Sequence, residues 1–254
     1  MNDIINHMNL NVILTKITSL GGSYAVFWQI QGQSPVFFAN AERFPSASII
    51  KVPLLLAWLL LEREGQVDSN ALCHLDAEPQ VQGAGFAWQM LTRQLPYGDV
   101  LRLMIALSDN LCTNLILQRV GMQRANETFQ RLGLTGVRLQ RKMMDLEARQ
   151  RGLDNWITPQ DCMRLYPLLE QLPPHQRSFA DSLLASCQDD SLLMRDVPRD
   201  TLTFHHKTGS LSGILHDWGY TSGRQVFLLT HGFMDETAAA QVFGELGRAV
   251  LLDA

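Results

Sequence analysis

Cysteine is scarce in this chain of 254 residues, and its spacing excludes two common uses of the residue. No pair follows the Cys-x-x-Cys pattern, so neither a disulfide framework nor a cysteine-based zinc site is expected. The sequence predicts four reduced and mostly buried thiols, at Cys73, Cys112, Cys162 and Cys187. His205-His206 is the only adjacent histidine pair, and neighbours on a strand point to opposite faces. We therefore expect no metal site and no cofactor.

Excess charge of either sign and long apolar runs are also missing. Lysine and arginine total 21 against 25 aspartates and glutamates, a net charge of −4 without a basic run, which argues against nucleic acid as partner. The longest apolar stretch, Val52 to Leu61, is too short to span a bilayer. The first residues lack the pattern of a secretory signal. These features predict a cytoplasmic protein without a membrane partner.

Apolar residues make up 46% of the chain, enough for a full core, and their spacing predicts an α+β arrangement. Strand-like segments lie near both ends of the chain, and the segment from Ser48 to about Leu193 is mostly helical. The expected terminal helices span 4–19 and 236–252, and the expected strands span 23–31, 35–38, 201–206, 217–221 and 225–230. The pattern therefore predicts a sheet built from both ends of the chain, covered by helices, with a helical insertion.

Three short motifs stand out in order along the chain: Ser48-Ile-Ile-Lys51, Ser108-Asp109-Asn110 and Lys207-Thr208-Gly209. The first alone is uninformative, because Ser-x-x-Lys occurs by chance about once in a chain of this length. Each motif also has an ordinary structural explanation: a solvated helix lysine, a helix cap and a strand end. All three in this order are much harder to obtain by chance, and they form the signature set of class A β-lactamases and penicillin-binding proteins.

The resemblance to class A β-lactamases and penicillin-binding-protein-like serine hydrolases extends over essentially the whole chain. Residues 45–54 resemble the nucleophile segment, residues 104–115 the helix of the second motif, and residues 204–213 the strand of the third. The resemblance implies an antiparallel sheet flanked by helices beside an all-helical subdomain, the β-lactamase/transpeptidase-like fold. We expect one catalytic domain over 1–254, with the sheet layer in 1–47 and 196–254 and the helical subdomain in 48–195.

The first motif supplies a nucleophile and a base. A serine hydroxyl attacks a carbonyl only when a base removes its proton, and Lys51 shares a helix face with Ser48. Lysine can serve as that base if its pKa is lowered, and a second ammonium at Lys207 in a partly dry cleft would lower it. The backbone N–H of Ser48 and a donor from Ser210 could stabilise the oxyanion.

The other two motifs are assigned to proton transfer and substrate binding. Ser108 would pass a proton to the leaving nitrogen, and Asn110 would hold the amide side chain of the substrate. Lys207 and Thr208 would bind a substrate carboxylate, while Gly209 allows close approach of the substrate to the strand edge.

The loop after the second motif departs from the family pattern. Enzymes of the family that hydrolyse β-lactams carry a glutamate there, with an asparagine four residues later, to position the water that cleaves the acyl-enzyme. Here Glu147 is the candidate, but Arg151 occupies the asparagine position and Asp145 competes for the role. A glutamate in a loop rich in lysine and arginine is most often a solvated ion-pair partner.

The sequence therefore predicts a serine hydrolase that cleaves an amide, β-lactam or ester through an acyl-serine. Its partner would be a small molecule or short peptide that carries a carboxylate. Two alternatives remain open: a peptidase or acyl-transfer enzyme, and a penicillin-recognising or ligand-binding protein that acylates but deacylates poorly.

Overall fold

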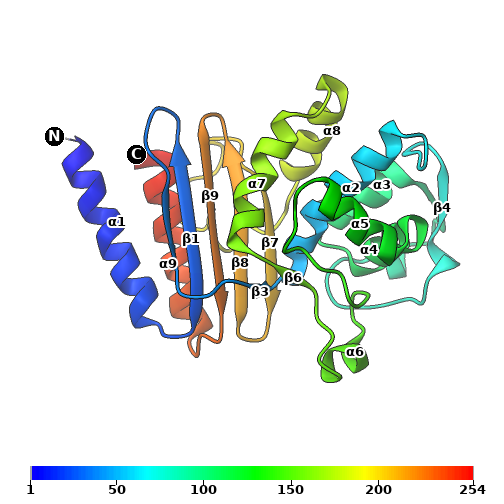
Figure 1. The fold of residues 1–254 in the computed structure, drawn as a ribbon, viewed down its shortest axis with the longest axis horizontal. Helices are drawn as coiled ribbons and strands as arrows, with labels where there is room; N and C mark the ends of the chain where they lie inside the picture. The colour runs from blue at the N-terminus through cyan, green and yellow to red at the C-terminus, as the bar shows by residue number, and fades with distance from the viewer. Residues whose placement is uncertain (1, 254) are drawn as a thin grey trace.

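The computed structural model describes the backbone of residues 2–253 and the side chains of residues 11–252. Its main sheet is antiparallel, with the strand order β2-β1-β9-β8-β7 (Figure 1). The strands of this sheet are β1 (Ser23–Ile30), β2 (Val36–Ala39), β7 (His205–Leu211), β8 (Ile214–Thr221) and β9 (Arg224–His231). The N-terminal strand β1 pairs along its full length with β9, so both ends of the chain form one sheet. The predicted α+β class is confirmed.

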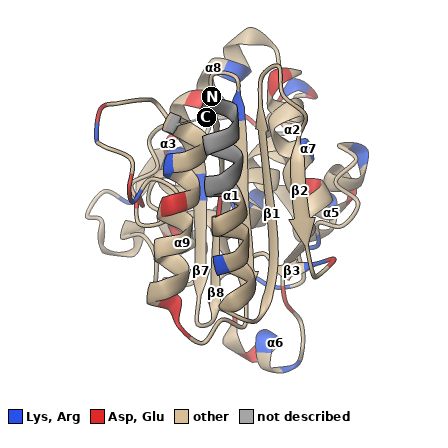
Figure 2. Cartoon of the chain, turned by 90° about the vertical axis from the view of Figure 1, so that its left-hand side faces the viewer, with Lys and Arg blue, Asp and Glu red and all other residues tan. Residues whose placement is uncertain are grey.

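Alternation along β1 divides the hydrophobic residues between two cores. Ala25 and Phe27 belong to the core shared with the helical part, whereas Val26 and Trp28 belong to the core under the terminal helices. This is the period of two that an extended strand imposes. The terminal helices α1 (Asn2–Ser19) and α9 (Glu236–Arg248) cover one face of the sheet, as Figure 2 shows. A π-helical turn, η4 (Ala249–Asp253), follows α9.

The helical part follows β1 and β2 in the chain and lies beside the β7 edge of the sheet (Figure 1). Its helices are α2 (Lys51–Arg63), α3 (Tyr97–Ala106), α4 (Asn110–Val120), α5 (Met122–Arg131), α6 (Leu146–Gln150), α7 (Pro159–Glu170) and α8 (Pro174–Leu184). Short elements connect them: β3 (Phe44–Pro45), β4 (Leu72–His74), β5 (Gln94–Pro96), β6 (Trp156–Ile157) and the 3₁₀ turns η1 (Ala47–Ile50), η2 (Leu75–Ala77) and η3 (Ala87–Gln89). Helix α7 lies across the sheet face opposite α1 and α9.

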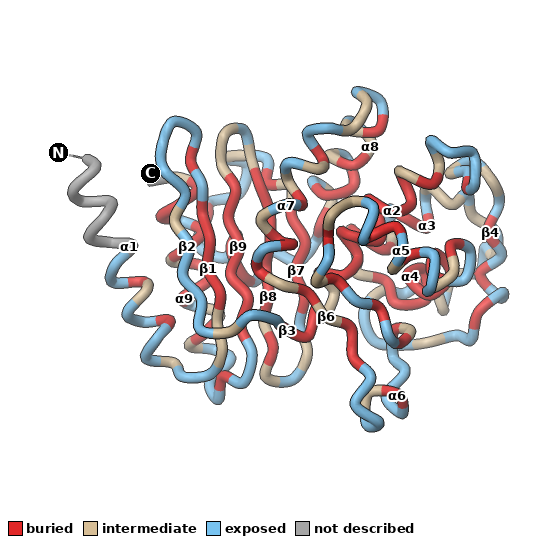
Figure 3. The backbone as a smooth tube through the Cα atoms, in the orientation of Figure 1, coloured by how far each residue is buried: buried red, intermediate tan, exposed pale blue. Residues whose placement is uncertain are grey.

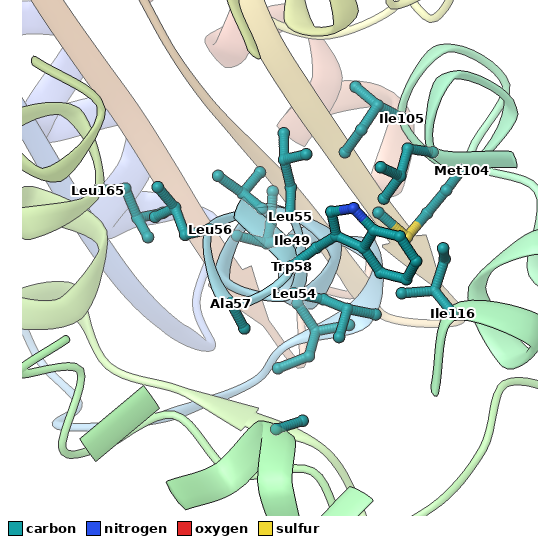
Figure 4. Close-up of a cluster of buried hydrophobic side chains, with 14 of the residues drawn as sticks. Ile49, Leu54, Leu55, Leu56, Ala57, Trp58, Met104, Ile105, Ile116 and Leu165 are labelled. Atoms are coloured by element: carbon teal, nitrogen blue, oxygen red, sulfur yellow. The ribbon is translucent and has the colours of Figure 1, made fainter. Parts of the chain in front are cut away.

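The central helix of this part is α2, and it is buried on almost every side (Figure 3). Figure 4 shows Trp58 near Met104 and Ile105, while Leu56 points toward Leu165 of α7. Trp58 is fully buried, and its indole N–H donates to the Oγ of Ser69 at 3.0 Å. A helix that is apolar all round needs such a position. Burial of α2 fixes the position of Lys51, its first residue.

One predicted strand begins later than expected. The sequence indicated a strand over 201–206, but β7 begins at His205 and continues to Leu211. The reason is the length of its partner: His205 pairs with Tyr220 of β8, and β8 ends one residue later, at Thr221. Residues 201–204 therefore have no ladder to join. The predicted division into a sheet layer and a helical subdomain at 47/48 and 195/196 stays a prediction.

Candidate active site

Ser48 lies in the 3₁₀ turn η1, directly before α2 begins at Lys51. Lys51 is fully buried, and its Nζ lies 3.1 Å from the Oγ of Ser48. Residues three apart eclipse each other in a 3₁₀ turn, which explains the close approach. Ala47, just before the nucleophile candidate, has a φ of +42°, a left-handed conformation rare for residues with a Cβ. Strain of this kind concentrates at functional sites.

The second motif meets the same ammonium from the connection between α3 and α4. Nζ of Lys51 lies 2.6 Å from the carbonyl oxygen of Ser108, 2.9 Å from its Oγ and 3.3 Å from Oδ1 of Asn110. Ser108 itself has a φ of +55°. Asp109 caps α4, because its Oδ1 accepts a hydrogen bond from the backbone N–H of Cys112 at 2.9 Å. Asp109 thus has a structural role, whereas Ser108 and Asn110 contact Lys51.

The third motif lies on β7, the edge strand of the sheet beside η1. Lys207 is 1% exposed, and its Nζ donates to the carbonyl oxygen of Thr208 at 2.8 Å. The hydroxyl of Thr208 donates to Oδ2 of Asp189, also at 2.8 Å. Asp189 was not predicted from the sequence. A pair of aspartates after a helix carries no local pattern that indicates contact with a distant strand. Gly209 packs against the backbone of η1.

The two buried lysines influence each other. Burial, and next the positive charge of Lys207, lower the pKa of Lys51 well below its ordinary value. Burial also lowers the pKa of Lys207, an effect that the nearby Cys187, Asp189 and Asp217 oppose. A buried amine beside a second ammonium is poised to lose its proton. The arrangement places an amine with a lowered pKa within hydrogen-bonding distance of the Ser48 hydroxyl.

A pocket of about 280 Å³ opens in front of Ser48. Ala47, Ser48, Asn110, Ser210 and Leu211 line it from the motif side, with Gly83 and Ala84 nearby. The opposite wall comes from the loop after α5, with Arg141, Met143, Met144, Leu146, Arg149 and Asn155. No carboxylate is among these described lining residues. The pocket is therefore bordered by two serines, two asparagine amides, apolar residues and two guanidinium groups.

Met143 is held firmly in this wall. Its backbone N–H donates to Oδ1 of Asn114 at 2.8 Å, and its carbonyl oxygen accepts from Nδ2 of Asn114 at 3.2 Å. Asn114 lies on α4, one turn after Asn110. A side-chain amide that bonds both backbone groups of one residue fixes that residue as a strand neighbour would. Met143 thus occupies a defined place in the Ser48 pocket, which the sequence did not reveal.

The structure does not bring Glu147 to the pocket. Its side chain is 89% exposed on the short helix α6, with an Oε2 3.9 Å from an arginine nitrogen of Arg151. Asp145 is also occupied elsewhere, because its Oδ1 accepts from the backbone N–H of Ala148 at 2.9 Å and so caps α6. This cap turns Glu147 outward. The placement gives no support to the predicted role of Glu147 or Asp145 in positioning water.

Over the described part of the chain, no cluster of three histidine, cysteine, aspartate or glutamate side chains could hold a metal ion. Among the helices that the structure describes, none has the length and apolarity needed to cross a membrane.

Comparison with solved structures shows the same fold over nearly the whole chain. A beta-lactamase from Sphaerobacter thermophilus is 26% identical, with a TM-score of 0.84 and 95% of each chain covered. An ancestral class A beta-lactamase is 22% identical, with a TM-score of 0.82 over 95% of this chain and 98% of that one. A mutant of PBP-A, solved as an acyl-enzyme complex with penicillin G, is 21% identical, with a TM-score of 0.81 over 96% and 94% of the two chains.

Curated protein sequences contain no match to this chain. The profile of the beta-lactamase enzyme family, in contrast, matches residues 11–253. That range includes all three motifs and every element from the end of α1 to η4. Membership supports a hydrolase that acts on small β-lactam or amide substrates. With its motifs gathered around one buried lysine and its fold shared with solved beta-lactamases, the chain belongs to the beta-lactamase enzyme family.

Proposed function

We propose that the protein is a serine hydrolase of the class A β-lactamase type, which opens an amide, β-lactam or ester through an acyl-enzyme on Ser48. The observation that carries the proposal is the contact between Nζ of Lys51 and Oγ of Ser48, 3.1 Å long and buried on the lysine side. A lysine with a lowered pKa at this distance can accept the serine proton.

In the proposed reaction, neutral Lys51 accepts the proton of Ser48 while Oγ of Ser48 forms a bond to the carbonyl carbon. The backbone N–H groups of Ser48 and Ser210 donate to the oxyanion. Ser108 Oγ, 2.9 Å from Nζ of Lys51, then relays the proton to the leaving nitrogen as the C–N bond breaks. All of these groups belong to the chain itself.

Substrate binding is assigned to the edge of β7 and to α4. Lys207 and Thr208 supply a positive charge and a hydroxyl for a substrate carboxylate, and Asn110 supplies an amide for the acyl side chain. The proposed substrates are thus small amides, lactams, esters or short peptides with a carboxylate. The expected cytoplasmic location stays a prediction from the sequence, which fractionation of expressing cells tests.

A second candidate function, acylation with slow release, is favoured by the wall of the pocket. Met143 forms part of the wall of the Ser48 pocket, whereas Glu147 is exposed and is not among the lining residues. Without a carboxylate to deprotonate water, an acyl group on Ser48 would persist. The PBP-A mutant of the same fold was itself solved as an acyl-enzyme with penicillin G. A long-lived acyl-enzyme would suit transfer to an acceptor, or recognition of a ligand.

Intact-protein mass spectrometry after mixing with penicillin G tests the proposal. Wild type and Ser46→Ala should either hydrolyse penicillin G or gain the mass of one penicillin, and Ser48→Ala should do neither. Ser46 is a fitting control because it is buried two residues away and binds only backbone groups. Hydrolysed penicillin without a lasting adduct favours the hydrolase, and a lasting adduct favours slow release. Equal labelling of Ser48→Ala would overturn the assignment.

A further inference from the structure

A second cavity, of about 560 Å³, lies behind the third motif and shares no lining residue with the Ser48 pocket. It is bordered by the turn after α8 and by the loop that leads into β7. Cys187 and His206 line it from inside, and Asp190, Arg195 and Arg199 are among its charged residues. None of the roles proposed above uses this cavity, although His206 directly precedes Lys207.

Three side chains come together in this region: Cys187, His206 and Asp217. Nδ1 of His206 lies 3.2 Å from Oδ1 of the fully buried Asp217. The other oxygen of Asp217 accepts from the backbone N–H of Leu193 at 3.0 Å, which fixes the carboxylate. Cys187 lines the same cavity as His206, and each side chain shifts the pKa of the other. A thiol beside a base that a carboxylate orients is the arrangement that activates cysteine as a nucleophile.

The charges agree with this geometry. Burial alone would lower the pKa of His206, but the carboxylate of Asp217 and the thiol of Cys187 raise it to about 10. Burial would raise the pKa of Cys187, yet the contacts with His206 and the charge of Lys207 lower it below the ordinary value. Asp190, 3.8 Å from Nε2 of His206, also favours the imidazolium. Both shifts favour the ion pair of a Cys187 thiolate and a His206 imidazolium.

The other three cysteines differ on each point. Burial is the first cause that raises the pKa of Cys73, Cys112 and Cys162. None of these three lines the Cys187 cavity, and none has a histidine among the groups that shift its pKa. Cys187, at 7% exposed, lies against open space, so a reagent as small as hydrogen peroxide can reach it. The chain thus contains one activated thiol and three matched controls.

We propose that Cys187 is an oxidation site for hydrogen peroxide and small hydroperoxides. The thiolate sulfur attacks one peroxide oxygen, so that an S–O bond forms as the O–O bond breaks. The departing hydroxide takes the proton of the His206 imidazolium and leaves as water. Sulfur is oxidised by two electrons to the sulfenic acid, and the peroxide is reduced by two.

Oxidation at this position also reaches the Ser48 site. The charge of Cys187 is one of the influences that raise the pKa of Lys207 against the effect of burial. After oxidation, His206 beside Asp217 regains a proton from solvent, while the sulfenic acid stays neutral. The influence of Cys187 on Lys207 is then lost, the pKa of Lys207 falls, and the positive charge at the position assigned to the substrate carboxylate weakens. Acylation by a carboxylate-bearing penicillin should therefore slow several-fold, a consequence that rests on the proposed function.

The first test needs no activity at Ser48. The folded protein is treated with stoichiometric peroxide together with a 1,3-diketone that traps sulfenic acids, and the modified peptides are mapped by mass spectrometry. We expect the trap on the peptide of Cys187 and little on those of Cys73, Cys112 and Cys162. Cys187→Ser should abolish the adduct. Trapping mainly at another cysteine, or none in folded wild type, overturns the proposal even if Ser48 is acylated normally.

The second test measures acylation by penicillin G before and after peroxide, and again after dithiothreitol. Wild type should slow and then recover, while Cys187→Ser should not show the recoverable loss. Dithiothreitol separates the thiol from Met143 and Met144 in the Ser48 pocket, because it does not reduce methionine sulfoxide. Trapping at Cys187 with unchanged acylation overturns the link to Lys207. If Ser48 is never acylated, the proposed function fails, while the trapping result still decides the oxidation site.

Discussion

Gly209 of β7 lies so close to Ser48 that a Cβ built on it would be 2.9 Å from the backbone nitrogen of Ser48. The same Cβ would also lie 3.1 Å from the backbone nitrogen of Ile49. Backbone atoms cannot move aside as a flexible side chain can, so only glycine allows this contact between strand and turn. Gly209 thus sets the distance between β7 and η1, the turn that contains Ser48.

Gly209→Ala should therefore slow acylation of Ser48 about a hundredfold, as expected when an oxyanion donor is displaced. The measurement is the rate of adduct formation with penicillin G. Gly98→Ala is the matched control, because a Cβ there would meet nothing closer than 3.5 Å. A variant at position 209 that acylates at the wild-type rate would contradict the role given to this contact.

Met143→Glu should speed hydrolysis of the acyl-enzyme by about a hundredfold or more, the usual scale of general base catalysis. The clamp from Asn114 holds this position in the pocket wall, so a carboxylate placed there can reach a water near Ser48. Decay of the penicillin adduct, followed by mass spectrometry, gives the rate. The control Met143→Gln introduces a side chain of the same size as glutamate but without its charge. Equal acceleration in both variants would show that the introduced carboxylate does not act as a general base.

Glu147→Gln should leave acylation, deacylation and stability unchanged. The side chain is 89% exposed, and its contact with Arg151 is a long surface ion pair. Asp145→Ala is the comparison, because removal of the α6 cap should cost about 1 kcal/mol of stability. Steady-state hydrolysis and thermal unfolding measure both effects. A burst of product followed by arrest in Glu147→Gln would contradict this prediction, because it would show that the Glu147 carboxylate is needed for deacylation.

The acylation rate should rise with pH and level off below the pH at which an ordinary lysine loses its proton. Only neutral Lys51 accepts the serine proton, and burial and Lys207 lower its pKa. With a neutral ester as substrate, Lys207→Ala should shift the rising part of the pH–rate profile to higher pH. The reason is that one of the two causes that lower the pKa of Lys51 is removed. A profile that does not shift in this variant would show that Lys207 does not lower the pKa of Lys51.

Stability should depend on pH through the same residue. The pKa of Lys51 is lower in the folded state, so between the folded and unfolded values the unfolded chain binds more protons. The free energy of unfolding therefore rises with pH in that window, and the cost of the buried ammonium is complete below the folded pKa. Lys51→Met should be more stable than wild type at low pH, with the difference shrinking as pH rises. Urea unfolding at several pH values measures it.

The sequence was sufficient for the α+β class, the terminal helices, the helical stretch between them and the three motifs, because each depends on local spacing. Alternation in β1 and the three-residue interval from Ser48 to Lys51 translate directly into geometry. The late start of β7 was not predictable, because it depends on where its partner β8 ends. The Asn114–Met143 clamp and the Cys187–His206–Asp217 cluster join residues far apart in sequence. No local pattern encodes such contacts.

The pairing of β1 with β9 sets an order of events during synthesis. Ser48 and Lys51 leave the ribosome early, but Lys207 and the strands that place β7 against η1 come near the end of the chain. The helices between them make mostly local contacts and can form first, whereas the sheet must wait for a distant partner. A nascent chain released before β9 would contain the nucleophile and its base but no assembled cleft. Under the proposed function, Ser48 and Lys51 would therefore stay inactive until β9 has been translated.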